Sequence, residues 1–215
     1  MVKTEAITLI KEDVLALGRM VDRTIGEVTG LLKKDEGANL TLIEQQEEEI
    51  NKSCHDIEER CMEVLLERPV LSAQEIRLLF GSCVIAAKFE RMADHANRVA
   101  KLATWACESA IDIPPELSEM AGVVKRMVED VLLSFLTDAA DRAQEMLQRD
   151  SQVDYLHDLL SKRLLSELGD QDQEEAQMRT QFLFGARFIE RMGDACCSIA
   201  KRIYFIVTGE RLKSE

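Results

Sequence analysis

A five-residue motif occurs twice in this chain, one hundred residues apart, and this repeat constrains the fold more than any other feature. Residues 90–94 read Glu-Arg-Met-Ala-Asp, and residues 190–194 read Glu-Arg-Met-Gly-Asp. Each copy is followed by an apolar residue, Ala and Lys, at residues 99–101 and 199–201. The repeat predicts an internal duplication, which a chain of 215 residues accommodates as two halves of about a hundred residues each.

The apolar residues recur at helical spacing in both halves. They alternate in steps of three and four, which is typical of the buried seam of a helical bundle. The chain also has only three prolines and 5% aromatic residues, so we expect an all-α protein. The seam residues are Ile7, Ile10, Val14, Leu17, Val21, Ile25, Val28 and Leu32 in the first half, and Leu117, Met120, Val124, Met127 and Val131 in the second.

Capping residues and helix breakers predict three helices in the first half. Asn39 is a helix cap, Ser72 with Glu75 forms a capping box, and Pro69 ends the helix before it. We expect the first helix to end near Lys33 and Lys34, the second to run from Asn39 to Glu67, and the third to run from Ser72 to Cys107.

The second half repeats this plan after a prolyl turn at residues 112–115. We expect Asp138 to cap the fifth helix, which ends at Gly169, and the sixth helix to run from near Asp172 to Gly209. Long helices that are joined by short loops pack antiparallel. The sequence therefore predicts two tandem three-helix bundles, one over residues 1–111 and one over residues 112–215.

Each half carries two acidic pairs at a spacing of four residues, which places both members of a pair on one helix face. The pairs are Glu47/Asn51 and Glu90/Asp94 in the first half, and Asp150/Asp154 and Glu190/Asp194 in the second. Like charges at this spacing repel, so we expect a cation opposite them. Carboxylate oxygens suit magnesium, manganese and iron. Ordinary surface salt bridges are the alternative interpretation.

The second half is the better candidate for a metal site. In the first half Arg98 lies four residues after Asp94 and can neutralise it, and Asn51 stands where the second half has a carboxylate. Ser198 occupies the place of Arg98 in the second half. His55 and His157 can flank these clusters, whereas His95, next to Asp94, is expected to face solvent.

Charge and composition exclude several classes of function. The net charge of −13 argues against binding to nucleic acid or to an anionic membrane. No apolar run reaches the length of a membrane span, and no secretory leader is recognisable, so we expect a cytoplasmic protein. The six cysteines show no CxxC spacing and are expected to be buried, reduced thiols. No P-loop and no nucleophile with its base is present.

The chain resembles the PhoU family of bacterial phosphate-uptake regulators. Residues 184–194 and 199–210 are similar to the C-terminal signature of that family, and residues 17–22 and 50–51 resemble its first and second helices. The resemblance covers almost the whole chain and implies two tandem three-helix bundles. It also implies metal clusters, of iron, manganese, magnesium or zinc, whose ligands would be Glu47, Glu90 and Asp94 in the first half and Asp150, Asp154, Glu190 and Asp194 in the second.

The resemblance further implies a non-catalytic regulator, commonly a homodimer. Such a protein restrains phosphate import and phosphate-starvation signalling through the ATPase of a phosphate ABC transporter and a phosphate-sensing histidine kinase. It would be cytoplasmic and peripheral to the inner membrane through these partners. Because the carboxylates repel phosphate, we expect phosphate to be sensed through a partner.

Two alternative functions remain open from the sequence. A ferritin-like di-metal oxidase also uses acidic pairs on facing helices, but that class adds a Glu-x-x-His motif, which this chain lacks. A structural helical bundle without metal is the other alternative.

Overall fold

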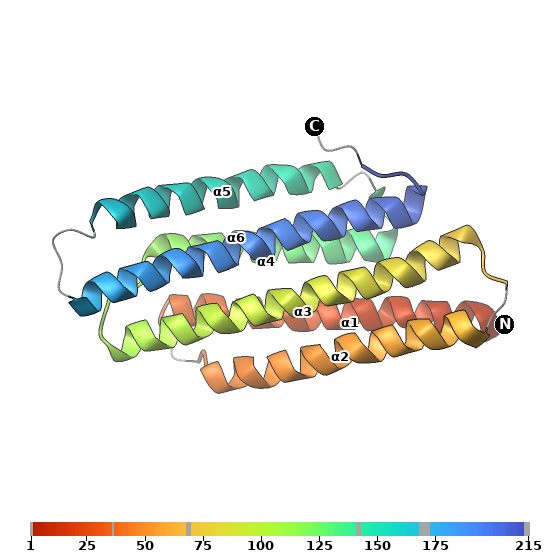
Figure 1. Cartoon of the computed structure of the whole chain (residues 1–215), viewed down its shortest axis with the longest axis horizontal. Helices are drawn as coiled ribbons and strands as arrows, with labels where there is room; N and C mark the ends of the chain where they lie inside the picture. The colour runs from red at the N-terminus through yellow and green to blue at the C-terminus, as the bar shows by residue number, and fades with distance from the viewer. Residues whose placement is uncertain (1, 36, 68–69, 141–142, 168–172, 213–215) are drawn as a thin grey trace.

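The computed structural model describes residues 2–35, 37–67, 70–140, 143–167 and 173–212, and the regular structure within these ranges is helical (Figure 1). The prediction of an all-α protein built from two three-helix repeats is confirmed. The first repeat comprises α1 (Val2–Leu32), α2 (Leu40–Glu67) and α3 (Ala73–Glu108), and the second comprises α4 (Pro115–Thr137), α5 (Ala143–Ser166) and α6 (Gln173–Thr208).

Most helix ends are where the capping residues predict them. The Asn39 side chain accepts a hydrogen bond from the backbone N–H of Thr41 at 2.9 Å, at the start of α2. Ser72 and Glu75 form the expected capping box at the start of α3. After α6 the chain enters the left-handed region at Gly209, with φ of 78°, a conformation that glycine adopts without steric cost.

The predicted role of Asp138 is wrong. Asp138 ends α4 in the left-handed conformation, with φ of 53°, and does not begin α5. Aspartate tolerates this conformation better than most residues do, and its carboxylate pairs with Lys11 of α1 at 2.8 Å. The predicted end of α5 at Gly169 and the predicted start of α6 near Asp172 lie outside the described residues.

The six helices lie roughly along one long axis, with α2 and α5 on opposite sides of the four others (Figure 1). The most extensive packing between any two helices joins α3 and α6, which belong to different halves, and α1 also packs on α4. The two three-helix repeats therefore share one interface. The division of the chain at residues 111 and 112 stays a prediction.

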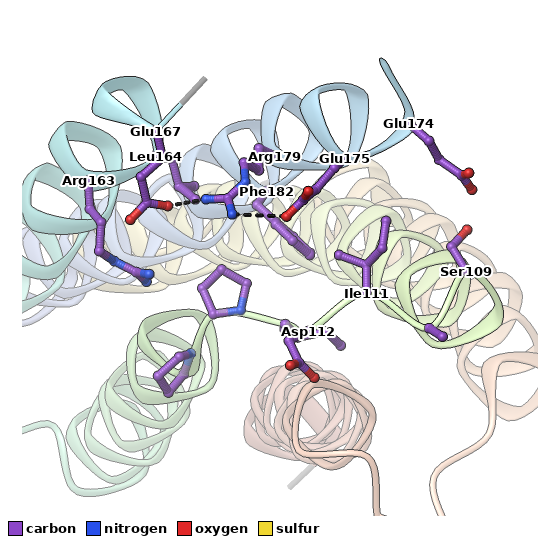
Figure 2. A pocket seen from close by; sticks show the side chains of 14 residues that line it. Ser109, Ile111, Asp112, Arg163, Leu164, Glu167, Glu174, Glu175, Arg179 and Phe182 are labelled. Atoms are coloured by element: carbon purple, nitrogen blue, oxygen red, sulfur yellow. Dashed lines mark hydrogen bonds and ion pairs between the residues drawn. The ribbon is translucent and has the colours of Figure 1, made fainter. Parts of the chain in front are cut away.

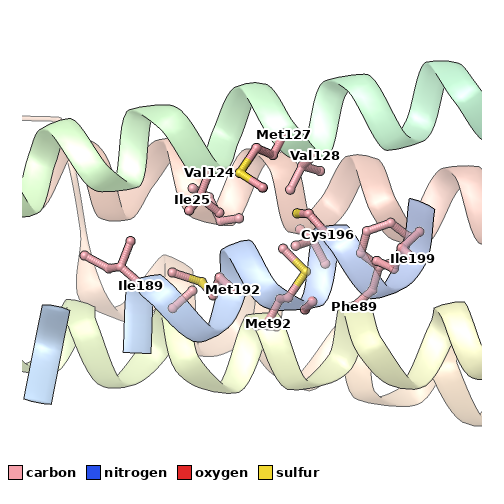
Figure 3. Close-up of a cluster of buried hydrophobic side chains, with 14 of the residues drawn as sticks. Ile25, Phe89, Met92, Val124, Met127, Val128, Ile189, Met192, Cys196 and Ile199 are labelled. Carbon is pink, nitrogen blue, oxygen red and sulfur yellow. The ribbon is translucent and has the colours of Figure 1, made fainter. Parts of the chain in front are cut away.

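The buried core runs continuously through both halves (Figure 3). Met92 and Met192, the methionines of the twin motifs, are both fully buried and lie near each other with Met127 and Cys196. Met120 and Met127 of the predicted seam are also fully buried. Because the motif methionines point inward, the charged residues of each motif face away from the centre of the molecule.

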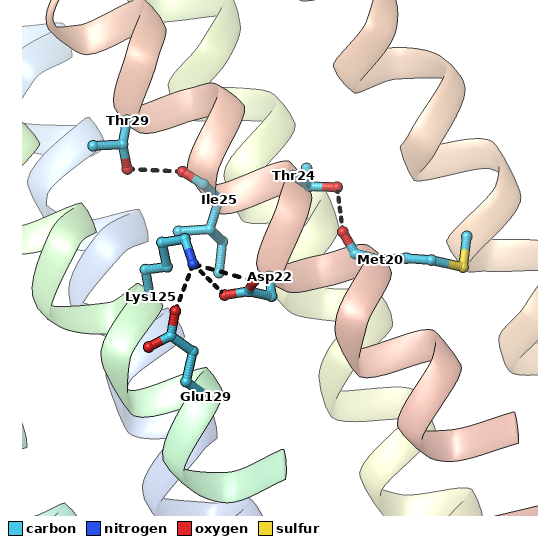
Figure 4. Close-up of polar contacts among 7 residues, drawn as sticks. All are labelled: Met20, Asp22, Thr24, Ile25, Thr29, Lys125 and Glu129. Carbon is cyan, nitrogen blue, oxygen red and sulfur yellow. Dashed lines mark hydrogen bonds and ion pairs between the residues drawn. The ribbon is translucent and has the colours of Figure 1, made fainter. Parts of the chain in front are cut away.

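A charged contact ties the first helices of the two repeats together (Figure 4). Lys125 Nζ of α4 donates to Asp22 Oδ1 of α1 at 2.9 Å and to Glu129 Oε1 at 2.7 Å. Burial lowers the pKa of Lys125, but the hydrogen bonds to Glu129 and Asp22 outweigh it and raise the pKa overall. This lysine therefore stays charged while it joins the two halves.

Two further observations concern the described helices and the cysteines. None of the described helices combines the length and the apolar character that a bilayer-spanning segment requires. All six cysteines are free thiols, and four of them are buried. The expectation of buried thiols is wrong for Cys107, which is exposed near the end of α3, and Cys83 is half-buried.

A substitution at Gly18 in α1 tests the close packing between the halves. A Cβ built on Gly18 would lie 2.3 Å from Leu132 Cδ2 of α4 and 2.9 Å from Phe89 Cζ of α3. Replacing Gly18 by Leu should therefore lower the free energy of unfolding by about 1–3 kcal/mol. Urea unfolding followed by circular dichroism measures this change.

The matched control is Gly122→Leu in α4, where the nearest heavy atom, Arg126 Nη1, would be 4.0 Å from the new Cβ. That variant should be neutral or stabilised by up to about 1 kcal/mol, because leucine favours the helix over glycine. Equal destabilisation by the two variants would contradict the packing described between α1, α3 and α4.

Candidate functional site

The twin motifs, residues 90–94 and 190–194, lie in the middle of α3 and α6. In a helix the motif Glu and Asp are about 40° apart around the axis, whereas the motif Met is about 160–200° from them. Because the methionines are buried between the halves, the carboxylates face outward, toward α2 in the first half and toward α5 in the second. Each motif thus contributes to a separate acidic cluster.

The first-half cluster, which we define as Glu47, Glu90 and Asp94, is partly neutralised. Burial raises the pKa of Glu90, and the charges of Asp94 and Glu47 raise it further, so the three predicted residues are brought together. Asn97 Nδ2 donates to Glu47 Oε2 at 3.0 Å. Arg98 pairs with Asp94 at 3.2 Å, as the four-residue spacing predicts.

The second-half cluster, which we define as Asp150, Asp154, Glu190 and Asp194, brings all four predicted carboxylates together. Burial raises the pKa of Asp150, as do the charges of Asp154 and Asp194, against the lowering effect of the nearby Cys197 thiol. Burial likewise raises the pKa of Glu190, with further contributions from Asp194 and Asp154. The carboxylates of α5 and α6 therefore repel one another across the helix interface.

A glycine gives Asp150 its close approach to α6. A Cβ on Gly193 would lie 3.1 Å from Asp150 Oδ1, so even an alanine side chain would crowd the carboxylate. The first half has Ala93 at this position. The small residue of the second motif thus makes room for a carboxylate from the neighbouring helix.

Carboxylates such as those of the second-half cluster are common ligands of metal ions, and one of their oxygens has no partner in the described ranges that a metal ion would have to displace. Glu190 Oε2 is buried and has no hydrogen-bond partner among the described residues, although Arg187 pairs with the other oxygen. No three His, Cys, Asp or Glu side chains of the described residues converge closely enough to form a ready metal site. The carboxylates would have to turn toward a common point to coordinate one.

Of the three histidines, one lies in a different environment from the one predicted. The prediction that His95 faces solvent is wrong, because its ring is buried and stacks on Phe188 with the ring centroids 5.4 Å apart. The burial of α3 against α6 thus reaches further round the helix than the sequence indicates. His55 and His157 lie beside the clusters, where their positive charge would lower the pKa of Glu90 and Glu190, respectively.

Three residues near the clusters were not predicted from the sequence. Asn97 and Cys197 occupy equivalent positions three residues after the motif Asp, and each lies beside a carboxylate of the neighbouring helix. Asn97 donates to Glu47, whereas the Cys197 thiol donates to the backbone oxygen of Met146 at 3.9 Å and lies close enough to Asp150 for each to shift the pKa of the other. Their helical spacing from the motif is the signal that could have found them. Arg187 lies three residues before Glu190 and could have been found in the same way.

One cavity among the described residues lies away from both clusters, beside the segment that joins the halves (Figure 2). It has a volume of about 690 Å³. The charged side chains on its wall already neutralise one another: Arg179 pairs with Glu167 and with Glu175, the latter at 3.1 Å. These pairs leave little free charge for the recognition of a ligand.

Comparison with known proteins gives a consistent result over the whole chain. The PhoU domain matches twice, at residues 14–103 and 117–203. A phosphate-specific transport system accessory protein PhoU homolog from Clostridium acetobutylicum is 26% identical over 204 residues, covering 94% of this chain and 93% of that protein. The homolog from Streptococcus pneumoniae is 27% identical over 203 residues, with 94% and 93% covered.

Two crystal structures have the same fold. The phosphate transport system regulatory protein PhoU from Streptococcus pneumoniae matches with a TM-score of 0.86 and 25% identity, over 99% of this chain and all of that one. PhoU from Pseudomonas aeruginosa matches with a TM-score of 0.89 and 23% identity, over 96% of this chain and 99% of that one, and supports the fold alone. With one PhoU domain in each of its two three-helix repeats, this chain belongs to the PhoU family.

Proposed function

We propose that this protein is a regulator of phosphate uptake and of phosphate-starvation signalling. The observation that carries the proposal is the double match to the PhoU domain, together with relatives that are named phosphate-specific transport accessory proteins and are covered almost end to end. The PhoU family is one of accessory and regulatory proteins and is non-catalytic. The protein therefore acts by binding other molecules.

The second-half cluster is the proposed metal site, with Asp150, Asp154, Glu190 and Asp194 as the ligands. Support comes from burial and mutual repulsion, which raise the pKa of Asp150 and Glu190, and from the unpartnered Glu190 Oε2. Iron, manganese, magnesium or zinc would supply the positive charge that these oxygens lack. A cation that bridges α5 and α6 would also hold these two helices in one register.

The first-half cluster is proposed as a weaker metal site, with Glu47, Glu90 and Asp94 as the ligands. Two of these three carboxylates already have a protein partner, since Asn97 donates to Glu47 and Arg98 pairs with Asp94. A metal ion would have to displace Arg98 from Asp94 or share that carboxylate with it. The two clusters therefore differ in affinity.

The proposed partners are the ATPase of a phosphate transporter and a phosphate-sensing histidine kinase, at the cytoplasmic side of the membrane, with the protein itself as a homodimer. The net charge of −13 supports a basic partner surface. On α2 the outward carboxylates Glu48, Glu49, Glu58, Glu59 and Glu63 are all exposed. This helix is the proposed site of first encounter with such a surface.

Elemental analysis of protein purified without chelator tests the metal proposal. We expect near-stoichiometric iron, manganese or zinc in the native chain and its loss in Glu190→Gln/Asp194→Asn, because that variant removes two charges from the second-half cluster. The matched variant Glu90→Gln/Asp94→Asn should keep most of the metal. A native protein that is folded but free of metal would overturn the proposal and leave a structural bundle as the better account.

Binding to purified partners tests the regulatory proposal. We expect the native chain to bind the transporter ATPase or the cytoplasmic part of the kinase, with an affinity that falls at least tenfold between about 50 and 500 mM salt. A variant with Glu48, Glu49, Glu58 and Glu59 changed to Gln should bind more weakly and lose most of the salt dependence. Normal phosphate uptake in a strain that lacks the protein, with no binding to either partner, would contradict a regulatory role.

A further inference from the structure

A second cavity, of about 320 Å³, lies where the middles of α3 and α6 meet, and its walls are mainly basic. We call it the basic cavity. Lys88, Arg91 and His95 line it from α3, and Arg191 and Asp194 line it from α6. Three permanent positive charges thus face one carboxylate in a chain whose net charge is −13.

The two arginines are the second residues of the twin motifs, and the fold brings them to the same cavity. Contacts near the helix ends indicate that α3 and α6 run antiparallel: a Cβ on Gly81 would touch Ile206, and one on Gly185 would touch Leu102. The middles of the two helices therefore lie side by side (Figure 1). Each arginine is about 100° round its helix from the motif Glu, so it lies to one side of the acidic cluster.

The cations of the basic cavity have no direct partner in the described part of the protein, although the charge of Arg91 also acts on Glu90 and lowers its pKa. Within the described ranges, Lys88, Arg91 and Arg191 make no hydrogen bond or ion pair with another residue. Neighbouring arginines of the same helices do: Arg98 pairs with Asp94, and Arg187 pairs with Glu190. Three cations without a direct partner in these ranges therefore meet at this cavity.

One residue of the cavity wall, His95, has a buried polar atom without a partner among the described residues. His95 is only 8% exposed, and its Nδ1 has no hydrogen-bond partner among the described residues. The nearest carboxylate oxygen, Asp94 Oδ2, is 4.0 Å away, which is beyond hydrogen-bond distance. The stack on Phe188 holds the ring in place. An unpartnered buried nitrogen costs free energy unless a ligand or water satisfies it.

We propose that the basic cavity binds an anion that carries a phosphate group, with Arg91, Arg191 and Lys88 contacting the phosphate oxygens. Arginine forms paired hydrogen bonds to phosphate, and lysine adds a mobile positive charge. A cavity of about 320 Å³ holds a phosphate group and part of a molecule attached to it. His95 would then contact the same ligand.

This binding site goes beyond the proposed regulation through partners, and it does not depend on it. The expectation that phosphate is sensed through a partner follows from the carboxylates of the motifs. The arginines of the same motifs lie in a different place and have the opposite charge. Asp194 is the only residue shared by the basic cavity and the second-half cluster among the described residues.

Isothermal titration calorimetry of the whole chain in the presence of EDTA tests the proposal, since chelation removes any cation that could bridge an anion to the carboxylates. The ligands are inorganic phosphate and ATP. Arg91→Gln and Arg191→Gln should each weaken binding by about tenfold or more, because each loses charge-assisted hydrogen bonds. Binding of inorganic phosphate identifies the free ion as the ligand, and binding of ATP alone identifies a larger phosphorylated molecule.

Arg126→Gln in α4 is the matched control. Arg126 is exposed and makes no hydrogen bond or ion pair with a residue in the described ranges, as is true of Arg91 and Arg191, but it lies away from the basic cavity. It should leave the affinity unchanged within about twofold. Circular dichroism and thermal melting establish that all variants are folded. Absence of binding of both ligands at millimolar concentration, or equal loss in all three arginine variants, would overturn the proposal.

Asp194→Asn distinguishes a binding role from a structural one. Removing the carboxylate takes a like charge away from the bound anion, so affinity should rise severalfold, opposite in sign to the arginine variants. Weaker binding in Asp194→Asn would mean that the carboxylate supports binding and does not repel the anion, and this result would refute the basic cavity as the site.

Discussion

The packing of α3 against α6 is the contact on which the rest of the structure depends. Met92 and Met192 are fully buried there, and their burial fixes how each helix is rotated about its axis. Once the methionines point inward, helical geometry sends the motif Glu and Asp to one side and the motif Arg to another. A single buried residue in each motif therefore determines the position of three charged ones.

This rotation separates opposite charges that are adjacent in sequence. Glu190 and Asp194 face α5, where Asp150 and Asp154 add to their repulsion, while Arg191 faces the basic cavity. The duplicated halves have diverged within this plan. The second half has Gly193 and four neighbouring carboxylates, of which Glu190 pairs with Arg187. The first half has Ala93, the Arg98–Asp94 ion pair and the hydrogen bond from Asn97 to Glu47. The proposed cation site is therefore stronger in the second half, while the first half stabilises its carboxylates with protein groups.

The sequence was sufficient for local structure and for the acidic clusters, because caps and four-residue spacings act within one helix. Asn39 and the Ser72–Glu75 box begin helices as predicted. Asp138 could not be assigned in this way, since an aspartate between two helices suits the end of one as well as the start of the next. The burial of His95 and the meeting of Arg91 with Arg191 depend on how α3 packs on α6 across the two halves, which no local pattern specifies.

The central claim is that each motif divides into a carboxylate side that binds a cation and an arginine side that binds an anion. Crystals grown with manganese and tungstate, a heavy analogue of phosphate, test it most directly through anomalous scattering. We expect a manganese peak among Asp150, Asp154, Glu190 and Asp194, and a separate tungstate peak between Arg91 and Arg191. A tungstate peak on the carboxylate-bound manganese, with none beside the arginines, would contradict it.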